Sequence, residues 1–401
     1  MDWQTPEDAV PSAFVTESNR RAISAKPPAS GAWRIGDDPG DRRFQRIGPL
    51  EFERGGSLPD VTIAYESWGE PNAAGDNAVL VLHALTGDSH LVGPAGPGHP
   101  TAGWWAGLVG AGKVLDPGRW YVVAPNMLGG CQGSTGPASL APDGTEWGPR
   151  FPYLTIRDQV EAQRAFADAL GIRRWAAVIG GSMGGMQSLE WAVSHPDRVE
   201  RFAVLAAPPV SSADQIALNS VQSEAIRMDP AFAGGDYYNA EDGEGPSAGL
   251  ALARRMALLN YRSPSELDDR FARSWQSGLN PMGGGGRFAV ESYLDFHGNK
   301  FTRRFDANSY LVLVDAMNSH DIGRDRDGIA AALRRASGLG LVLGIDSDRL
   351  FPVAGQRAIA RQLPNSISGA EPVVISSPFG HDAFLIEDLL VGRELARLLD
   401  A

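Results

Sequence analysis

The sequence predicts an α/β fold in which a mostly parallel sheet carries helices on both faces and is interrupted by a helical lid insertion. Short, fully apolar runs of strand length alternate with amphipathic helical segments, which is typical of parallel strands buried on both sides. The alternation stops near residue 208 and returns near residue 337, with helical patterns between. We therefore expect a core made of residues 46–207 and 337–401 and a helical lid made of residues 208–336.

Composition and charge narrow the class of protein. With 401 residues, of which 43% are hydrophobic, the chain has enough apolar material for a sizeable core. A net charge of −12 argues against a nucleic-acid partner, because phosphate binding needs a basic face. We see no apolar run of about 18 residues and no signal peptide, so we expect no membrane span and a cytoplasmic location. The single cysteine, Cys131, excludes an internal disulfide and a cysteine-based metal cluster.

The elements follow in chain order. Residues 1–45 are rich in polar residues, Pro, Gly and Arg without periodicity, which predicts a flexible N-terminal arm. Short β-like runs between Leu50 and Trp68 predict an antiparallel hairpin. The continuous apolar runs predict strands over 78–83, 120–125, 175–179, 202–206, 340–345 and 372–375. Helical patterns cover 157–170, 183–194, 353–362 and 384–399 in the core, and 213–227, 248–261, 265–276, 288–297 and 307–318 in the lid.

The strongest chemical signal is Gly180-Gly181-Ser182-Met183-Gly184, which fits the pattern G-x-S-x-G. It directly follows a predicted strand and directly precedes a predicted helix. This context is what a nucleophile elbow requires, because a strained turn there exposes the serine hydroxyl at the end of the sheet. A glycine-rich turn without chemistry is the alternative, and the flanking elements favour the nucleophile. We therefore predict an α/β-hydrolase fold with Ser182 as the catalytic nucleophile.

A serine nucleophile needs a base, and the base needs a carboxylate that orients it. In this fold the acid and then the histidine follow the nucleophile along the chain. His381 follows the last predicted strand, and both Asp346 and Asp348 follow the strand before it. Spacing favours Asp348 only weakly, because it lies at the loop tip, so Asp346 stays an alternative. His320 is also followed by an aspartate, but it precedes both candidate acids and fails the chain order.

The intermediate of such a reaction needs two N–H donors for its oxyanion. We expect one from Met183, at a helix N-terminus where the dipole also favours negative charge. The second is expected from the loop 83–87, with Leu85 as the first choice and Thr86 as the alternative. The remaining histidines show no paired ligand spacing, so we predict no metal site. Residues 107–113 have the glycine spacing of a phosphate-binding loop, but no strand precedes them and the required hydroxyl residue is missing.

Six motifs resemble those of the homoserine O-acetyltransferases of the α/β-hydrolase superfamily. They cover residues 83–90, 126–137, 180–187, 318–321, 347–352 and 380–382, and the resemblance runs from about residue 47 to the C-terminus. In that family the serine, aspartate and histidine of the triad match Ser182, Asp348 and His381. The resemblance therefore decides between the two candidate acids in favour of Asp348.

The resemblance also implies the substrates. An arginine matching Arg254 holds the carboxylate of L-homoserine and an aspartate matching Asp382 holds its ammonium group. For the arginine, an ordinary salt bridge within the lid is the alternative, and for the aspartate a helix N-cap. The implied reaction is a ping-pong acetyl transfer from acetyl-CoA, through acyl-Ser182, to the homoserine hydroxyl, a step toward methionine. It needs no cofactor besides acetyl-CoA as co-substrate, and the family resemblance implies a homodimer.

Two segments depart from the family pattern. Residues 206–210 lack the expected small residue followed by arginine, and residues 324–328 carry acids where glycines are usual. Both lie near the lid, where acyl donor and acceptor are selected. A related O-acyltransferase that uses succinyl-CoA or a serine acceptor, or an esterase on the same triad, therefore remains an alternative. A catalytically silent binding protein is a third hypothesis, against which the complete triad argues.

Overall fold

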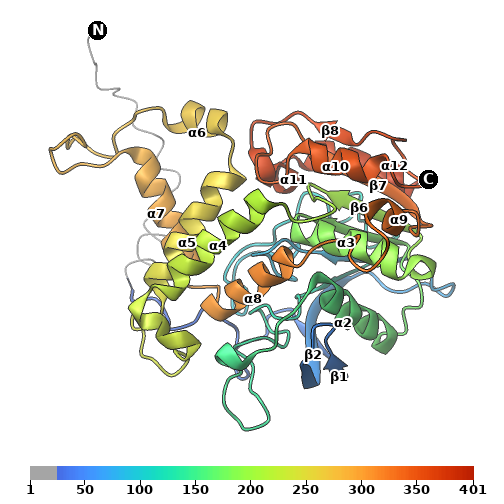
Figure 1. The fold of residues 1–401 in the computed structure, drawn as a ribbon, viewed down its shortest axis with the longest axis horizontal. Coiled ribbons are helices and arrows are strands. Elements are labelled where there is room, and N and C mark those ends of the chain that lie inside the picture. Colours follow the sequence, from blue (N-terminus) through green and yellow to red (C-terminus); the bar gives the residue numbers. More distant parts are fainter. Residues whose placement is uncertain (1–24) are drawn as a thin grey trace.

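The computed structural model describes residues 25–401, and its centre is an eight-stranded sheet (Figure 1). The strand order is β1-β2-β4-β3-β5-β6-β7-β8, in which β2 runs antiparallel to β1 and β4 and the other neighbours are parallel. This confirms the predicted mostly parallel sheet. The strands are β1 Arg43–Glu51, β2 Ser57–Trp68, β3 Ala78–Leu82, β4 Tyr121–Pro125, β5 Ala177–Gly181, β6 Arg201–Leu205, β7 Leu339–Ile345 and β8 Val373–Ile375.

Helices cover both faces of this sheet, as predicted. In β3, Leu80 belongs to the apolar layer shared with α2 (Ile156–Ala169) and α3 (Met183–Ser194), whereas the preceding Val79 belongs to the layer shared with α12 (Asp388–Leu399). Because successive side chains of a strand point to opposite faces, both neighbours must be apolar when both faces are covered. This arrangement is the physical reason for the unbroken apolar runs in the sequence.

The helix starts follow local capping chemistry. Thr155 accepts a hydrogen bond from the backbone N–H of Asp158, whose side chain in turn accepts from the backbone of Thr155, so α2 begins at Ile156. Ser212 and Gln215 form the same reciprocal pair at the start of the first lid helix. Such capping boxes satisfy backbone donors that the first turn of a helix leaves free.

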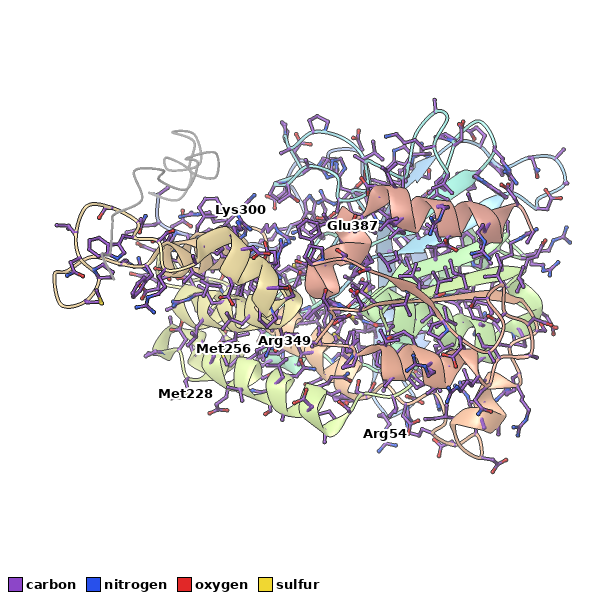
Figure 2. The ribbon with its side chains drawn as sticks, turned by 90° about the horizontal axis from the view of Figure 1, so that it is seen from above. Arg54, Met228, Met256, Lys300, Arg349 and Glu387 are labelled. Atoms are coloured by element: carbon purple, nitrogen blue, oxygen red, sulfur yellow. The ribbon has the colours of Figure 1, made fainter. Side chains whose placement is uncertain are left out.

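The lid lies between β6 and β7 in the chain. In Figure 1 its first four helices extend to one side of the sheet, and α5 packs between α4 and α7. Figure 2 shows the same block from above, with Met228 and Met256 on the lid and Glu387 on the core. The helices are α4 Ala213–Arg227, α5 Ser247–Tyr261, α6 Pro264–Phe271, α7 Ala289–Phe301 and α8 Ala307–Asn318, followed by the short α9 Ile329–Leu333 and, in the core, by α10 Val353–Ala360.

Two predicted helices differ from the structure. The pattern over 265–276 predicted one helix, but α6 ends at Phe271 because Ala272 takes a left-handed backbone with φ of 42°. The following chain instead pairs Trp275 with Phe288 in an antiparallel bridge. The closing helix predicted over 384–399 is divided at Glu387 into α11 (Ala383–Ile386) and α12, because the ψ of 57° at Glu387 is not helical.

The N-terminal part of the chain is described from residue 25, so residues 1–24 of the predicted arm lie outside the described residues. Beyond them, Ser30 Oγ donates to Asp306 Oδ1 at 2.7 Å and the N–H of Gly31 donates to the carbonyl of Phe305 at 3.2 Å. The hairpin begins at Arg43, earlier than the predicted Leu50. Among the helices of residues 25–401, none is both long and apolar enough to cross a bilayer.

Candidate active site

Ser182 lies at the turn between β5 and α3, as the sequence predicts. Its backbone has φ of 58° and ψ of −124°, and its N–H donates to the carbonyl of Leu205 at 2.9 Å. The glycines of the motif are needed because a Cβ at Gly180 would lie 2.0 Å from the carbonyl oxygen of Gly184. A Cβ at Gly184 would lie 2.1 Å from the carbonyl oxygen of Leu82. The turn is therefore a strained strand–turn–helix elbow that only this spacing of glycines permits.

Ser182, His381 and Asp348 form one chain of hydrogen bonds. His381 Nε2 lies 2.8 Å from Ser182 Oγ, and His381 Nδ1 lies 2.7 Å from Asp348 Oδ2. The second carboxylate oxygen, Asp348 Oδ1, accepts from the backbone N–H groups of Leu350 and Phe351, each at 2.9 Å. All three triad side chains are buried. The arrangement has the geometry of a nucleophile, a base and an orienting acid.

The two rival residues lie elsewhere. Asp346 is exposed and accepts a hydrogen bond from the N–H of Ser377 at 3.1 Å. His320 is buried, and its Nε2 lies 3.0 Å from the carbonyl oxygen of Pro208. Burial lowers the pKa of His320 to about 4, so its imidazole is neutral at physiological pH. The structure therefore brings Asp348, and neither of the rivals, to His381.

The protonation of His381 depends on two opposing influences. Burial favours the neutral imidazole, whereas the charge of Asp348 and its hydrogen bond to Nδ1 favour the imidazolium. The second influence is the stronger, and the pKa of His381 is raised above its ordinary 6.5. The rings of Phe351 and Phe384 pack edge-on to the imidazole at 5.0 and 5.5 Å between centroids. Packing and hydrogen bonds thus fix the orientation of the imidazole, as a general base requires.

The predicted oxyanion donors lie next to Ser182. Met183 is the first residue of α3, so its N–H has no partner within the helix and points out of the helix N-terminus. Leu85 and Thr86, the two alternatives for the second donor, line the same cavity as Ser182. Their roles as donors stay predictions.

The loop after β3 is held by a histidine that the sequence did not single out. His83 Nδ1 lies 2.8 Å from the carbonyl oxygen of Ala84, which also accepts from the N–H of Gly87 at 2.9 Å. The N–H of Met127 donates to His83 Nε2 at 3.1 Å, which places the imidazole proton on Nδ1. Because a trans peptide is planar, fixing the Ala84 carbonyl also fixes the direction of the Leu85 N–H on the opposite side of the same peptide.

A cavity of about 170 Å³ opens beside Ser182. Its walls come from the loop after β3, the lid and the segment after β8, so the core and the lid enclose it together. It contains both residues predicted to hold the acceptor, Arg254 and Asp382. The other lining residues are Ala84, Leu85, Thr86, Gly87, Asp88, Thr101, Trp104, Tyr261, Arg304, His381, Phe384 and Leu385.

Arg254 and Asp382 have surroundings that suit a ligand. Arg254 Nη1 donates to Thr86 Oγ1 at 3.2 Å, and within residues 25–401 no carboxylate forms an ion pair with it, so it is not an ordinary lid salt bridge. Asp382 precedes α11 but its side chain makes no capping hydrogen bond. Asp382 Oδ2 lies 3.4 Å from Arg262 Nε. Burial raises the pKa of Asp382, partly offset by Arg262 and His381.

Arg304 is a charged residue of the cavity that the sequence did not single out. Arg304 lies just before α8, and its Nη2 donates to the carbonyl oxygen of Thr86 at 2.9 Å. No motif surrounds it, and the adjacent Arg303 carries the same charge but donates to the carbonyls of Ala25 and Lys26. A basic pair beside a lid helix was the only signal, and it does not say which arginine faces the substrate.

A second polar cluster lies outside this cavity. Potential ligand atoms of Asp41, Glu66, His90 and His99 lie within 4.8 Å of one another. However, Glu66 Oε2 already pairs with His90 Nδ1 at 3.0 Å, and His99 Nε2 accepts from the N–H of Asp41 at 2.9 Å. The two imidazoles stack at 3.8 Å with planes only 12° apart, so their in-plane lone pairs do not converge on one ion. We interpret the cluster as a buried ion pair, and the absence of a metal stays a prediction.

The chain is similar in sequence and in fold to known proteins. Residues 77–388 match the family described as the alpha/beta hydrolase fold. The homoserine O-acetyltransferase of Leifsonia xyli subsp. xyli (strain CTCB07) is 68% identical over 402 aligned residues, which cover 100% of both chains. A solved homoserine O-acetyltransferase from Bacillus anthracis has a TM-score of 0.81 at 26% identity, covering 90% of this chain and 97% of its own. An acetylester hydrolase from Corynebacterium glutamicum has a TM-score of 0.77 at 27% identity, with the same coverage of 90% and 97%.

Proposed function

The chain belongs to the homoserine O-acetyltransferase family of the α/β-hydrolase fold, and from this membership we propose that it moves the acetyl group of acetyl-CoA to the hydroxyl of L-homoserine. It is an enzyme of the acyltransferase class. The observation that carries the proposal is the hydrogen-bonded chain from Asp348 through His381 to Ser182, which opens into a cavity lined by both a basic and an acidic group. The product, O-acetylhomoserine, is an intermediate on the way to methionine.

The first half-reaction loads the enzyme. His381 Nε2 takes the proton of Ser182 Oγ while the oxygen attacks the thioester carbonyl of acetyl-CoA. The oxyanion that forms is held by the backbone N–H groups of Met183 and Leu85. The carbon–sulfur bond then breaks, and coenzyme A leaves with the proton from His381. The acetyl group remains as an ester on Ser182, and no cofactor besides the co-substrate acetyl-CoA is needed.

The second half-reaction unloads it. The hydroxyl of homoserine gives its proton to His381 and attacks the acetyl ester, and Ser182 leaves with that same proton. Water competes as an acceptor, so the lid must exclude it and hold homoserine close to the ester. Arg254 suits the substrate carboxylate because a guanidinium offers two parallel N–H donors. Asp382 suits the ammonium group, and it is the residue next to the base.

The lid also supports the proposal of a homodimer. Large apolar side chains are exposed on the lid helices α4 and α5 and at their ends. Met228, which follows α4, has 73% of its surface exposed. Exposed apolar side chains on two packed helices of a biosynthetic enzyme fit a second copy of the chain. The exposed apolar residues on these helices and at their ends are Ile216, Val221, Met228, Leu252 and Leu259.

We propose the cytoplasm as the location, where acetyl-CoA is available to biosynthetic enzymes.

A product assay tests the function directly. The enzyme is given acetyl-CoA or succinyl-CoA, each with and without homoserine, and products and protein adducts are measured by mass spectrometry. With homoserine present, we expect acetyl-CoA to give O-acetylhomoserine and succinyl-CoA to give no product. When homoserine is omitted, we expect acetyl-CoA to leave an acetyl adduct on Ser182. Ser182→Ala should show no adduct. Preferred succinyl transfer would contradict the donor, and thioester hydrolysis that homoserine does not divert would identify an esterase instead.

A further inference from the structure

Two arginines of the lid meet at one threonine in the active-site cavity. Arg254 donates to the side-chain hydroxyl of Thr86 at 3.2 Å, and Arg304 donates to the backbone carbonyl of the same residue at 2.9 Å. Both guanidinium groups also lie over the ring of Phe301, with their Cζ atoms 5.0 and 5.5 Å from its centroid. The two cations therefore flank one small volume beside the loop that carries Leu85.

Within the described part of the chain, no carboxylate lies within ion-pair distance of Arg254 or Arg304, although Asp88 and Asp382 line the same cavity. Burial, together with the charge of Arg254, lowers the pKa of Arg304, against the raising influence of Asp88. Two guanidinium groups that lie close together with no ion-pair partner among the described residues destabilise each other, and an anion bound between them removes that cost.

We propose that Arg304 is a specificity-determining residue that binds the carboxylate of the amino-acid acceptor together with Arg254, an inference that rests on the proposed function. A carboxylate has two oxygens, and each accepts more than one hydrogen bond, so two guanidinium forks satisfy it completely. The acids of the same cavity then face the ammonium group. A cavity with paired basic and acidic walls matches a zwitterion.

The donor is a poorer match for this pair of cations. The thioester end of acetyl-CoA is uncharged, and its phosphates are separated from the reacting carbonyl by the long pantetheine arm. Arg304 contacts Thr86, the neighbour of the predicted oxyanion donor Leu85, so it lies close to the reacting group. An anion recognised at this position belongs to the acceptor.

The backbone holds Arg304 in place from outside the cavity. Its carbonyl oxygen accepts from Gln132 Nε2 at 2.6 Å. A Cβ at Gly31 would lie 2.5 Å from the backbone nitrogen of Arg304, so the backbone near Gly31 packs directly against the backbone of Arg304. Because the donor is positioned before the substrate arrives, little ordering is left for the binding step.

The test compares two acceptors and two arginines. Arg304→Met and Arg304→Lys are assayed with homoserine and with 3-amino-1-propanol, which keeps the amine and the hydroxyl but lacks the carboxylate. Acylation alone is followed with acetyl-CoA in the absence of acceptor. Arg303→Met, which removes the same charge from the neighbouring residue outside the cavity, is the control. Thermal unfolding checks that each variant is folded, and the Lys variant retains the charge if the Met variant is unstable.

We expect kcat/KM for homoserine to fall about 10- to 100-fold in Arg304→Met, the range for a hydrogen bond to a charged group. Arg304→Lys should lose less, and Arg303→Met little. Transfer to 3-amino-1-propanol and acylation should match the wild type. An equal loss with both acceptors, a loss in acylation, or wild-type activity toward homoserine would overturn the role of Arg304. If the wild-type enzyme becomes acylated yet makes no product with homoserine, the proposed function fails, and this inference fails with it.

Discussion

The carboxylate of Asp348 lies 2.7 Å from Nδ1 of His381, and the two residues come from the loops after β7 and β8, which are neighbours in the sheet. The parallel pairing of those strands therefore brings the acid and the base together. Two backbone N–H groups hold the other oxygen of Asp348, so the carboxylate is fixed in position. This contact sets the tautomer of His381, the proposed base, and raises its pKa.

Replacing Asp348 by Asn should therefore change the pH profile as well as the rate. Without the carboxylate, the two largest influences that raise the pKa of His381 are lost, and burial is opposed only by the charge of Asp382, so the acid limb of kcat/KM should move to lower pH. In the wild type that limb should lie above pH 6.5, because the base must be neutral. The wrong tautomer should also lower kcat by about 10⁴-fold, the size seen in a serine protease triad.

Asp346→Asn is the matched control for this prediction, because Asp346 lies on the same loop but is exposed and bonded to Ser377. It should keep both the rate and the profile of the wild type. A profile that moves in the Asp346 variant and not in the Asp348 variant would show that the acid was assigned to the wrong residue. The measurement is the initial rate at several pH values under limiting substrate.

His83→Leu should impair every half-reaction equally. The substitution removes one of the two donors that hold the Ala84 carbonyl and leaves only the N–H of Gly87, so the peptide that carries the Leu85 N–H is held less firmly. Loss of one oxyanion donor costs about 10²–10³-fold in kcat. We expect a decrease toward the lower end of that range for acylation and for transfer to any acceptor, with KM unchanged. Single-turnover rates with acetyl-CoA and with each acceptor measure it, and an effect confined to one acceptor would contradict the role.

Acid should destabilise the fold through His320. Its folded pKa of about 4 lies below the ordinary 6.5, so between these values the unfolded chain binds the additional proton. The stability that the neutral His320 provides is therefore present above pH 6.5 and is lost as the pH falls toward 4. One such group accounts for up to about 3 kcal/mol over that window. Urea unfolding gives the free energy of unfolding at pH 7 and at pH 5, and the loss between these pH values should be smaller for His320→Gln than for the wild type. An equal loss in both proteins would show that His320 is not its cause.

The segment 324–328, which departs from the family pattern, should tolerate the family's glycine better than its own acid. Asp327 is exposed and has a left-handed backbone with φ of 58°, a conformation that glycine adopts without strain. Asp327→Gly should raise the free energy of unfolding by about 0.5 kcal/mol. Gly328, with φ of 89°, is the opposite control, and Gly328→Ala should lower it by about 1 kcal/mol. Urea unfolding measures both changes in the free energy of unfolding, and changes of the same sign in the two variants would contradict this effect of the backbone conformation.

The sequence was informative wherever chemistry and local geometry coincide. The elbow at Ser182 could be predicted because its glycines, strand and helix are neighbours in the chain, and chain order then selected His381. The acid was ambiguous from spacing alone, since Asp346 and Asp348 differ only in which way their loop turns. That direction depends on hydrogen bonds to Leu350 and Phe351, which only the folded loop provides.

The missed residues share a different cause. Arg304 reaches the cavity because a lid corner packs against the loop at Thr86, and no local pattern encodes such packing. His83 was one of the histidines without paired ligand spacing, and its effect on the Leu85 peptide follows from the carbonyl of Ala84, which it helps to hold. The early end of α6 likewise depends on the pairing of Trp275 with Phe288, which competes with helical propensity.

The division of the triad along the chain has a consequence for how the protein is made. The elbow at Ser182 can form once β5, α3 and β6 have left the ribosome, because the N–H of Ser182 donates to the carbonyl of Leu205 in β6. In contrast, β7 joins β6 only after the whole lid has been synthesised. The acid and the base arrive after that. A nascent chain that has not reached His381 therefore carries a serine without a base and cannot cleave the thioesters around it. The hydroxyl of Ser182 therefore gains its base only after β8 has been synthesised.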